Sequence, residues 1–482
     1  MFAGAWFSFV AIVIGGSMLF PPAKEGTHST ALLYKFAMND MPRKEEKVPT
    51  VGRALIANLE TMQLSLFEDA NLVKTFPILS KGRPGTPWET PSGSYAIQLK
   101  EVKHLSSIGG TWMPYSMQFY GNFFIHGWPT YTNGEDVPVG YSGGCIRLGT
   151  VDAGEVYKFI PKGAKLIVLN SAHASDFATS SRYYLHGEGT PPTISASTFV
   201  VEDIDSGKIL WEHGAREARN PKGLTLLVTA LTALETVNQY KLVRMSELLL
   251  GISILRKHPI GAIDEMPVGT LIYPLLFDES DTAAKVFARE HGTRQFVRYM
   301  NEKSRAIGMD ETKFGGALST DESTTTARDL ATLLRYVEKQ KHFLIDVTMA
   351  KERTLSDSNG DERYAWSNKN PFVLSDDGAY RGGIVAKSQD NNGSAMLIFD
   401  VPVTEFGSRK ISIVLLDSSD IIGDVTKLRA FVEEHFIYGI ENQSSIFIRE
   451  NTEPTPSLIK KAKDLLHLEQ LLNDVIDYQR DV

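Results

Sequence analysis

The spacing of apolar residues changes along this chain, and the change divides it into parts of different construction. Between residues 51 and 169, short segments such as residues 62–67 alternate apolar with polar side chains, and turns containing Gly and Pro, such as residues 82–85, separate them. Several short strands divided by turns of this kind are typical of an all-β sandwich or barrel. The pattern therefore predicts a mainly-β domain over residues 51–170.

A second pattern begins after residues 171–192, which are rich in Ser and Ala in their first half and indicate a linker. Two apolar runs flank Asp205, Ser206 and Gly207, and this arrangement predicts a β-hairpin. Helical stretches follow at residues 224–237, 282–307 and 325–339, and strands return at residues 395–401 and 411–416. A hairpin, helices and further strands indicate a layered α/β domain over residues 193–420.

Beyond residue 420 the chain is predicted to be mostly helical. Between residues 458 and 478, apolar side chains recur at steps of three and four residues, which is the spacing of one helix face. We expect a helical C-terminal extension over residues 421–482 that packs or docks rather than catalyses. A length of 482 residues agrees with such a multidomain chain, because a domain usually takes about 100–200 residues.

The first 22 residues form a segment of their own. Residues 2–20 are apolar or small and carry no charge, and Pro21 and Pro22 end the run. This length is about enough for a helix to cross a bilayer, so we predict a membrane anchor or an export signal, with a buried core helix as the alternative. The polar residues 23–50 then form a linker. Basic residues follow the run and none precedes it, which by the positive-inside rule would keep the body cytoplasmic.

Charge and composition exclude two kinds of ligand. The formal net charge is −8, and acidic and basic residues are interspersed without a long basic run. A nucleic-acid-binding surface needs clustered Lys and Arg, so we expect no nucleic acid as a partner. One Cys and scattered His residues give no ligand spacing for zinc, and we expect no metal and no other cofactor.

The single cysteine, Cys145, cannot form an internal disulfide. A lone cysteine is either a buried small hydrophobe or a candidate nucleophile. His126 lies 19 residues before it, and an imidazole can take the thiol proton to give the thiolate that attacks a carbonyl. On a strand, Arg147 would share the face of Cys145 and could pair with a substrate carboxylate; the alternative is a surface salt bridge.

The residues just before the cysteine are small. Ser142, Gly143 and Gly144 let the backbone approach a substrate without bulky side chains in the way. Their N–H groups can then point at a developing oxyanion, as acyl transfer requires. We therefore predict that this loop binds the substrate or its oxyanion.

Two motifs carry a resemblance to a known family. His126-Gly127, followed by SGGCIRL at residues 142–148, resembles the signature of the L,D-transpeptidases that cross-link peptidoglycan. Upstream, FPILSKG at residues 76–82 and TPSGSY at residues 90–95 look like that family's strand and its Thr-Pro-x-Gly turn. The resemblance covers about residues 52–170. Many members carry a second His at the position of Gly143, and this departure puts a substrate contact in doubt rather than the activity.

The resemblance implies roles for these residues. Cys145 is the nucleophile, His126 is the base, and the carbonyl of Gly127 orients the imidazole. The N–H groups of Gly144 and Cys145 are the expected oxyanion donors. Carbapenems acylate the cysteine of this family, so the same adduct is expected here.

The implied reaction is acyl transfer on peptidoglycan stem peptides. Cys145 attacks the amide carbonyl before the terminal D-Ala of a donor tetrapeptide, and D-Ala leaves behind a thioester. The side-chain amine of a diamino acid at position three of an acceptor stem then forms a 3→3 cross-link. Resolution by water would make the protein an L,D-carboxypeptidase, and resolution by a protein amine would make it an anchoring enzyme. A non-catalytic peptidoglycan-binding or regulatory module is the remaining alternative.

This substrate decides the expected location. Cross-links form outside the cytoplasmic membrane, so both domains are expected in the periplasm or another extracytoplasmic space, on a single-pass protein of the inner membrane. The chemistry thus overrides the orientation that the basic residues after the first segment would suggest.

Residues of about 193–420 resemble another cell-wall family, the D-alanyl-D-alanine carboxypeptidases, which are low-molecular-weight penicillin-binding proteins. The likeness rests on the hairpin at residues 195–212 and on residues 300–309 and 326–331. That family uses the motifs Ser-x-x-Lys, Ser-x-Asn and Lys-Thr-Gly. Here the first has Gly223 and Leu226 in place of Ser and Lys, the second has Glu279 and Asp281 in place of Ser and Asn, and the third falls near residues 385–387.

These changes remove the chemistry of that family. Glycine has no oxygen that could attack a carbonyl, and leucine cannot accept a proton. We therefore predict that the second domain kept its fold and lost acylation. Such a domain could hold stem peptides, position Cys145 or dock a cell-wall protein, and a packing scaffold without a ligand is the alternative.

Overall fold

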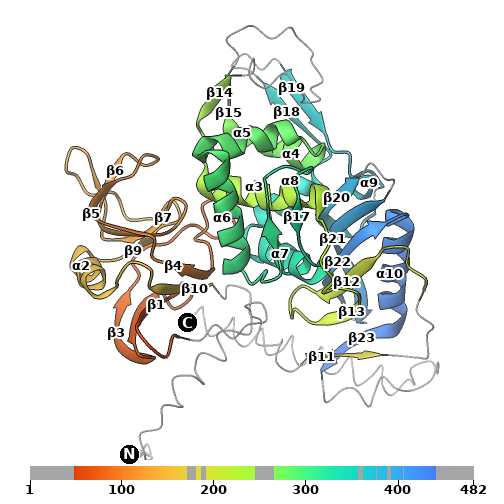
Figure 1. The fold of residues 1–482 in the computed structure, drawn as a ribbon, viewed down its shortest axis with the longest axis horizontal. Coiled ribbons are helices and arrows are strands. Elements are labelled where there is room, and N and C mark those ends of the chain that lie inside the picture. The colour runs from red at the N-terminus through yellow and green to blue at the C-terminus, as the bar shows by residue number, and fades with distance from the viewer. Residues whose placement is uncertain are drawn as a thin grey trace, which may run out of the picture.

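The computed structural model describes residues 48–170, 181–185, 192–244, 265–356, 362–375, 377–387, 392–404 and 407–440. The apolar segment at residues 1–22, the linker before residue 48 and the predicted helix at residues 458–478 lie outside these residues. Among the described helices, none has the length and apolar character that a membrane span needs. Two bodies stand side by side in Figure 1, one built from the strands up to β10 and one from the later elements.

The first domain holds two five-stranded sheets. The strands of the first sheet, in the order β3-β2-β1-β10-β4, are β1 (Arg53–Asn58), β2 (Gln63–Glu68), β3 (Asn71–Pro77), β4 (Gly93–Ala96) and β10 (Lys165–Leu169). The strands of the second, in the order β5-β6-β7-β9 with β8 paired to β6, are β5 (Leu99–Leu105), β6 (Thr111–Tyr120), β7 (Phe123–His126), β8 (Thr130–Tyr131) and β9 (Ile146–Arg147). One helix, α2 (Thr150–Phe159), was not predicted and packs on β6.

The alternation seen in the sequence places one face of each sheet in a common core. In β2, Leu64 and Leu66 are buried, whereas Gln63 at the start of the strand is exposed. The inward side chains of both sheets belong to one cluster of buried apolar residues, which includes Leu55, Leu64, Leu66, Met117, Phe119, Ile125 and Ile146. This packing holds the short strands β7 and β9 side by side, and the site described below depends on them.

The second domain is built on one antiparallel sheet. Its strands, in the order β13-β12-β22-β21-β20, are β12 (Thr198–Asp203), β13 (Ile209–His213), β20 (Tyr380–Lys387), β21 (Gly393–Thr404) and β22 (Gly407–Ser418). The predicted hairpin is β12 with β13. Because helices cover both faces of this sheet, every residue of β12 is buried.

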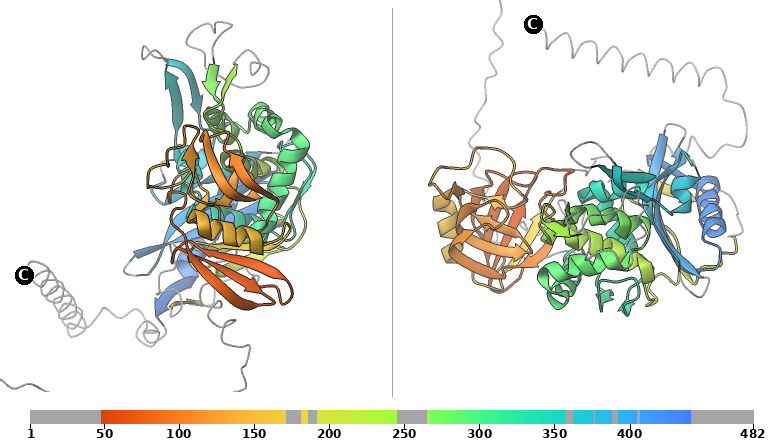
Figure 2. Two further views of the ribbon diagram at one scale, coloured as in Figure 1. Left: turned by 90° about the vertical axis from the view of Figure 1, so that its left-hand side faces the viewer. Right: turned by 90° about the horizontal axis from the view of Figure 1, so that it is seen from above.

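Most helices lie on one face of this sheet and a smaller group lies on the other (Figure 2). Those of the larger group are α3 (Thr225–Thr236), α4 (Ile272–Phe277), α5 (Asp281–His291), α6 (Thr293–Ala306), α7 (Ala327–Gln340) and α8 (His342–Met349), preceded by the 3₁₀ turns η2 (Lys222–Leu224) and η4 (Val268–Leu271). The short α9 (Pro371–Leu374) packs beside β20, and α10 (Ile421–His435) covers the opposite face. Helix α3 is buried along its whole length and forms the centre of the largest core.

The remaining strands form two-stranded ribbons. They are β11 (Ser181–Leu185) with β23 (Phe436–Ile440), β14 (Leu242–Arg244) with β15 (Glu265–Pro267), β16 (Lys313–Phe314) with β17 (Ser323–Thr324), and β18 (Glu352–Ser356) with β19 (Glu362–Ser367). β11 lies in the segment predicted as a linker, and β23 interrupts the extension predicted as helical. The two strands pair with each other although they lie about 250 residues apart in the sequence. No local pattern reveals this pairing.

One predicted helix is two. The sequence pattern indicated a single helix over residues 282–307, whereas α5 ends at His291 and α6 begins at Thr293. Gly292 between them has φ of 78°, in the left-handed region that ends a helix. The prediction was wrong because one glycine inside an apolar pattern does not by itself break the period.

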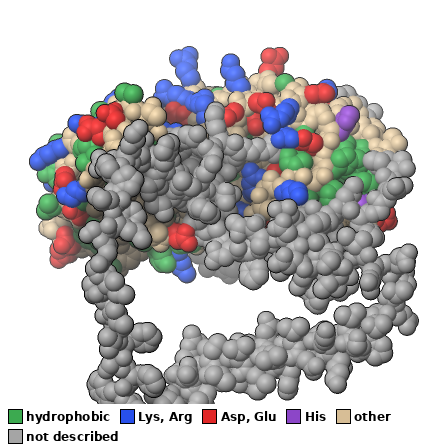
Figure 3. All heavy atoms as spheres, turned by 90° about the horizontal axis from the view of Figure 1, so that it is seen from below, with side chains coloured by type: hydrophobic (Ala, Val, Ile, Leu, Met, Phe, Trp, Pro, Cys, Tyr) green, Lys and Arg blue, Asp and Glu red, His purple; other side chains and the backbone are tan. Residues whose placement is uncertain are grey.

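On the face of the molecule drawn in Figure 3, the described Lys and Arg side chains are interspersed with Asp and Glu. This agrees with the even distribution of charges along the chain.

Candidate active site around Cys145

Two short parallel strands bring the predicted site residues together. β7 pairs with β9 so that Ile125 lies opposite Ile146 and His126 lies opposite Arg147. Ile125 and Ile146 point into the core, so the alternate residues point to the other face. Cys145 directly precedes β9 and, two residues before Arg147, shares that face with His126. Tertiary pairing thus brings residues 19 positions apart in the sequence onto one side of a sheet.

The imidazole of His126 is buried and oriented by its own neighbour. Its Nδ1 lies 2.6 Å from the carbonyl oxygen of Gly127, and a carbonyl oxygen can only accept, so Nδ1 carries the proton. The Nε2 atom of the neutral ring then carries the lone pair that can take a proton. Burial lowers the pKa of His126 to about 4, because the charged form loses its water.

The thiol of Cys145 is held by a backbone carbonyl. Cys145 Sγ donates to the oxygen of Asn122 at 3.7 Å, and among the hydrogen bonds of the described residues none joins it to His126. Burial raises the pKa of Cys145 to about 11, although the amide of Phe124 and the charge of Arg147 favour the thiolate. Without substrate, the site therefore holds a neutral thiol and a neutral imidazole rather than an ion pair.

This neutral state predicts how Cys145 reacts with iodoacetamide. Only the thiolate is nucleophilic, and with a pKa near 11 its fraction rises about tenfold for each pH unit up to that value. The alkylation rate of the native protein should therefore still be rising at pH 10, whereas a free cysteine levels off above about pH 8.5. Intact-protein mass spectrometry reads the rate, and the signal belongs to one site because the chain has one cysteine. A plateau below pH 8 would mean a thiolate–imidazolium pair instead.

The loop before the cysteine is a closed turn. Ser142 Oγ donates to the carbonyl of Cys145 at 2.6 Å and accepts from the N–H of Gly144 at 3.1 Å. Its own N–H donates to the carbonyl of Lys81 at 2.8 Å. The Gly144 N–H thus has a partner within the turn in this conformation, and its oxyanion role stays a prediction. Ser142 holds the turn through these three hydrogen bonds.

The two glycines of this turn differ in what surrounds them. Gly144 has φ of 103°, and a Cβ there would lie 2.2 Å from the ring of Phe123 and 3.1 Å from the carbonyl oxygen of Trp88. A Cβ on Gly143 would meet nothing within 4 Å. The position of Gly143 therefore has room for a side chain, and that of Gly144 has none.

This contrast predicts a difference in stability. Gly144→Ala combines backbone strain with overpacking and should lower the free energy of unfolding by about 2–4 kcal/mol. Gly143→Ala, one residue earlier, should change it by less than about 0.5 kcal/mol. Urea denaturation of both variants, followed by circular dichroism, measures the two values. Equal effects would show that the turn tolerates a side chain at either glycine.

Arg147 faces the site, and one N–H donor of its guanidinium has no partner among the described residues. Its guanidinium lies over the ring of Trp128 at 5.7 Å, and its Nε is buried without a hydrogen-bond partner among the described residues. Its charge lowers the pKa of both His126 and Cys145, so it lies close to both. A cation with an open donor beside a nucleophile suits a carboxylate of the substrate.

The degenerate motif positions of the second domain also come together. A Cβ on Gly223 would lie 2.1 Å from Glu279 Oε2 and 2.8 Å from the methyl group of Ala386. These three residues come from the three stretches matched to the carboxypeptidase motifs. The Glu279 carboxylate thus fills the space that a serine side chain at Gly223 would need. Glu279 has φ of 49°, an unfavourable backbone conformation for a residue with a side chain.

The other two positions have structural partners. Leu226 is buried in the core around α3. Asp281, the first residue of α5, accepts from the N–H of Ser319 at 2.8 Å and from the hydroxyl of Thr320 at 3.3 Å. Neither side chain is placed to activate a nucleophile.

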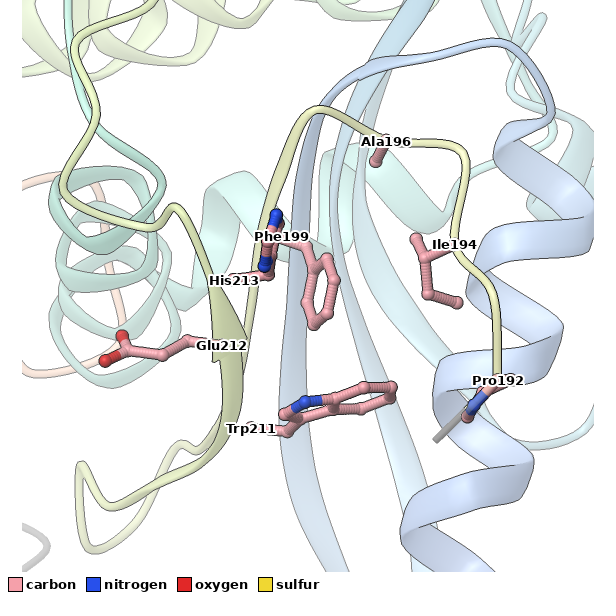
Figure 4. Close-up of a pocket in the computed structure, with 7 residues that line it drawn as sticks. All are labelled: Pro192, Ile194, Ala196, Phe199, Trp211, Glu212 and His213. Atoms are coloured by element: carbon pink, nitrogen blue, oxygen red, sulfur yellow. The ribbon is translucent and has the colours of Figure 1, made fainter. Parts of the chain in front are cut away.

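A separate pocket lies in the second domain. It has a volume of about 260 Å³ at the outer edge of the second domain, between the start of β12, β13 and α10 (Figure 4). Phe199, Trp211 and Ile194 point toward one another there, whereas Glu212 points away. No group in its lining resembles a catalytic pair. Among the described residues, no group of three or more His, Cys, Asp and Glu side chains could hold a metal ion.

Comparison with known proteins assigns each domain to a family. Residues 52–168 match the family of L,D-transpeptidase catalytic domains, and residues 187–384 match the D-alanyl-D-alanine carboxypeptidase family. By family, the chain joins an L,D-transpeptidase domain to a D-alanyl-D-alanine carboxypeptidase domain. The two-domain prediction made from the sequence is confirmed. The site around Cys145 lies in the transpeptidase domain, and the positions of Gly223 and Glu279 lie in the carboxypeptidase domain.

Similar individual proteins match the carboxypeptidase domain. A D-alanyl-D-alanine endopeptidase of Escherichia coli is 20% identical over 251 residues, which are 50% of this chain and 78% of that protein. A D-alanyl-D-alanine carboxypeptidase of the same organism is 27% identical over 161 residues, 30% of this chain and 42% of that protein. Among solved structures, a penicillin-binding protein homologue of Mycobacterium tuberculosis has 19% identity and a TM-score of 0.43, with 52% of this chain and 95% of that chain covered. The DD-transpeptidase of Streptomyces K15 has 22% identity and a TM-score of 0.42, with 50% and 98% covered.

Sequence reasoning missed three contributors to the site of the transpeptidase domain. Asn122 and Phe124 act on the thiol through their main chains, which no motif records. Trp128 contacts Arg147 through its ring, and only its place two residues after His126 could have indicated this.

Proposed function

We propose that this protein is a peptidoglycan L,D-transpeptidase in which Cys145 carries the acyl group and 3→3 cross-links are the product. The observation that carries the proposal is the shared face of Cys145, His126 and Arg147 in a domain of the transpeptidase family. The carbonyl of Gly127 fixes His126 in the tautomer that a general base needs.

The proposed reaction has two steps. His126 Nε2 takes the thiol proton as Sγ attacks the amide carbonyl before the terminal D-Ala of a donor tetrapeptide. The C–N bond breaks, D-Ala leaves with the proton from the imidazolium, and a thioester remains. The side-chain amine of an acceptor stem then attacks the thioester, its proton passes to His126, and the thiol is restored. Arg147 would hold a carboxylate of the stem peptide during both steps.

Because the thiol and the imidazole are both neutral without substrate, the bound substrate must start the proton transfer between them. A thiol of pKa near 11 does not transfer its proton to an imidazole of pKa near 4 without help. A bound carbonyl that displaces the thiol from the Asn122 oxygen would couple proton transfer to attack. Protection of the thiol until substrate arrives agrees with an enzyme exposed to an oxidising compartment.

Purified disaccharide-tetrapeptide tests the proposal. The protein is expected to release D-Ala and produce a 3→3 dimer, identified by liquid chromatography and mass spectrometry, and Cys145→Ala should produce neither. Tripeptide monomer alone would identify an L,D-carboxypeptidase. No turnover, together with no carbapenem adduct on the wild-type protein, would favour a peptidoglycan-binding or regulatory module. The matched control is Ser94→Ala, since Ser94 lies on β4 outside the site.

We also propose that the carboxypeptidase domain does not form an acyl-enzyme. Gly223 stands where that family has its serine, and the carboxylate of Glu279 fills the space beside it. A fluorescent penicillin should leave Cys145→Ala unlabelled under conditions in which an active carboxypeptidase is labelled. Label on this variant, mapped to the carboxypeptidase domain, would contradict the proposal.

The proposed substrate, peptidoglycan, lies outside the cytoplasm. We propose that both domains are extracytoplasmic, that residues 1–22 anchor or export them, and that the carboxypeptidase domain binds a cell-wall protein. Alkaline phosphatase fused after Val482 should be active in cells. Activity of a cytoplasm-dependent reporter at the same position, with inactive phosphatase, would refute this location.

A further inference from the structure

The two domains share a buried charged cluster. Glu235 of α3 binds Lys303 Nζ of α6 at 2.8 Å and lies 3.6 Å from Nζ of Lys341, which follows α7. All three side chains are completely buried. Burial lowers the pKa of Lys303 to about 8 despite the neighbouring carboxylate. Charges removed from water in this way need every available partner.

Lys303 also donates to the hydroxyl of Tyr336 on α7, and both lysines take further partners from the transpeptidase domain. Lys303 Nζ donates to the hydroxyl of Tyr95 on β4 at 2.9 Å and lies 4.7 Å from the centre of the ring of Tyr120. Lys341 Nζ donates to the carbonyl of Glu89 at 2.6 Å. Ala306 at the end of α6 belongs to the core of the transpeptidase domain. The domains are thus docked through a common interior, and Figure 1 shows α6 beside β4.

One contact across this interface reaches the nucleophile directly. Asn122, in the turn between β6 and β7, donates from Nδ2 to the carbonyl of Thr236 at 2.5 Å. Thr236 is the last residue of α3, where a helix leaves a carbonyl without a partner inside the helix. The carbonyl of the same Asn122 accepts the hydrogen bond of Cys145 Sγ. A single residue therefore connects the end of α3 to the thiol.

A second contact reaches the other side of the site. Lys341 lies near the carbonyls of both Pro87 and Glu89, at 3.5 Å and 2.6 Å. Trp88 between them stacks on Tyr240 of the carboxypeptidase domain, with ring centres 6.0 Å apart. The carbonyl of Trp88 lies 3.1 Å from the position of a Cβ on Gly144. The carboxypeptidase domain thus holds the segment that packs against the turn before Cys145.

We propose that the carboxypeptidase domain acts in cis as a positioning module for Cys145. The Asn122 amide and the carbonyl of Glu89 receive partners from the other domain. The carbonyl of Asn122 accepts from the thiol, and Trp88, next to Glu89, packs against the turn before Cys145. Asn122, Tyr240 and Lys341 are positioning residues: they set the place of the thiol without touching a substrate. Loss of its own chemistry would leave the domain with this structural task.

Asn122→Ala tests the proposal by removing the amide while keeping the main-chain carbonyl. Release of the turn should expose the thiol and lower its pKa by about one unit, which raises the iodoacetamide rate at pH 8 about tenfold. A carbapenem should in contrast acylate the variant about tenfold or more slowly, because small displacements of a nucleophile are costly. Opposite shifts of the two rates distinguish lost positioning from general destabilisation. The control is Asn133→Ala in an exposed turn of the same domain, which should match the wild type.

Tyr240→Ala is the second variant, since this side chain is 70% exposed and its removal should leave the fold intact. It should shift the alkylation profile in the same direction. Near-ultraviolet circular dichroism confirms that each variant is folded before its rate is compared. An alkylation profile equal to that of the wild type in both folded variants would overturn the proposal. Because alkylation needs no peptidoglycan, this result is independent of whether the proposed transpeptidase activity is found.

Discussion

His126→Asn is expected to lower the rate at which a carbapenem acylates Cys145 by about 10²–10⁴-fold, the usual contribution of a general base. The thiol has a pKa near 11, so at neutral pH it reacts only if a base takes its proton as the bond to carbon forms. The lone pair on Nε2 of His126 is the base that the shared face and the Gly127 carbonyl make available. Asparagine is polar and of similar size, but it cannot accept a proton at this pH. Intact-protein mass spectrometry over time gives the rate constants.

His104→Asn is the matched control for this experiment. His104 lies on β5 of the same sheet, hydrogen-bonds to Glu101 at 2.6 Å and stacks on Phe124, but it is outside the motif. Its replacement should change the acylation rate by less than about threefold. If His126→Asn and His104→Asn behaved alike, His126 would not be the base.

Glu235→Gln is expected to lower the free energy of unfolding by about 3–5 kcal/mol, the usual cost of leaving buried charges without their counter-ion. Glu235 is the carboxylate between Lys303 and Lys341, and the substitution leaves both ammonium groups buried between the domains. The loss should separate the unfolding of the two domains, because these lysines also hold Tyr95 and Glu89. Differential scanning calorimetry of the whole chain measures both the loss and the number of transitions.

Glu155→Gln serves as the surface counterpart. Glu155 pairs with Lys74 at 2.7 Å, and both side chains are about half exposed, at 48% and 49%. An ion pair in contact with water contributes less than about 1 kcal/mol, so this variant should melt close to the wild type. An equal loss of unfolding free energy in both variants would mean that the buried cluster stabilises the protein no more than an exposed ion pair does.

The layers of both domains followed from local patterns. Alternation in residues 62–67 predicted β2, and the turn at Asp205, Ser206 and Gly207 predicted the hairpin of β12 and β13. Thr326 before α7 caps its first turn by accepting from the N–H of Asp329. Such features depend on a few neighbouring residues and can be read from them. The pairing of β11 with β23 and the break at Gly292 depend on distant partners and on one dihedral angle, so they could not be predicted.

The sequence by itself determined the chemistry that the site can offer. One cysteine, a histidine followed by glycine, and the segment SGGCIRL supply a thiol, an imidazole and a small-residue turn, because these properties belong to the side chains themselves. Gly223 likewise has no hydroxyl to offer at its position in the carboxypeptidase domain, whatever the fold.

Only the tertiary structure decided the state of these groups. The pKa values of Cys145 and His126 depend on burial, and the oxyanion donor expected at Gly144 is taken by Ser142. The contact from Thr236 through Asn122 to the thiol joins residues more than a hundred positions apart. Solvation and hydrogen-bond partners are set by what surrounds a group in space, and neighbours in the sequence specify only a small part of those surroundings.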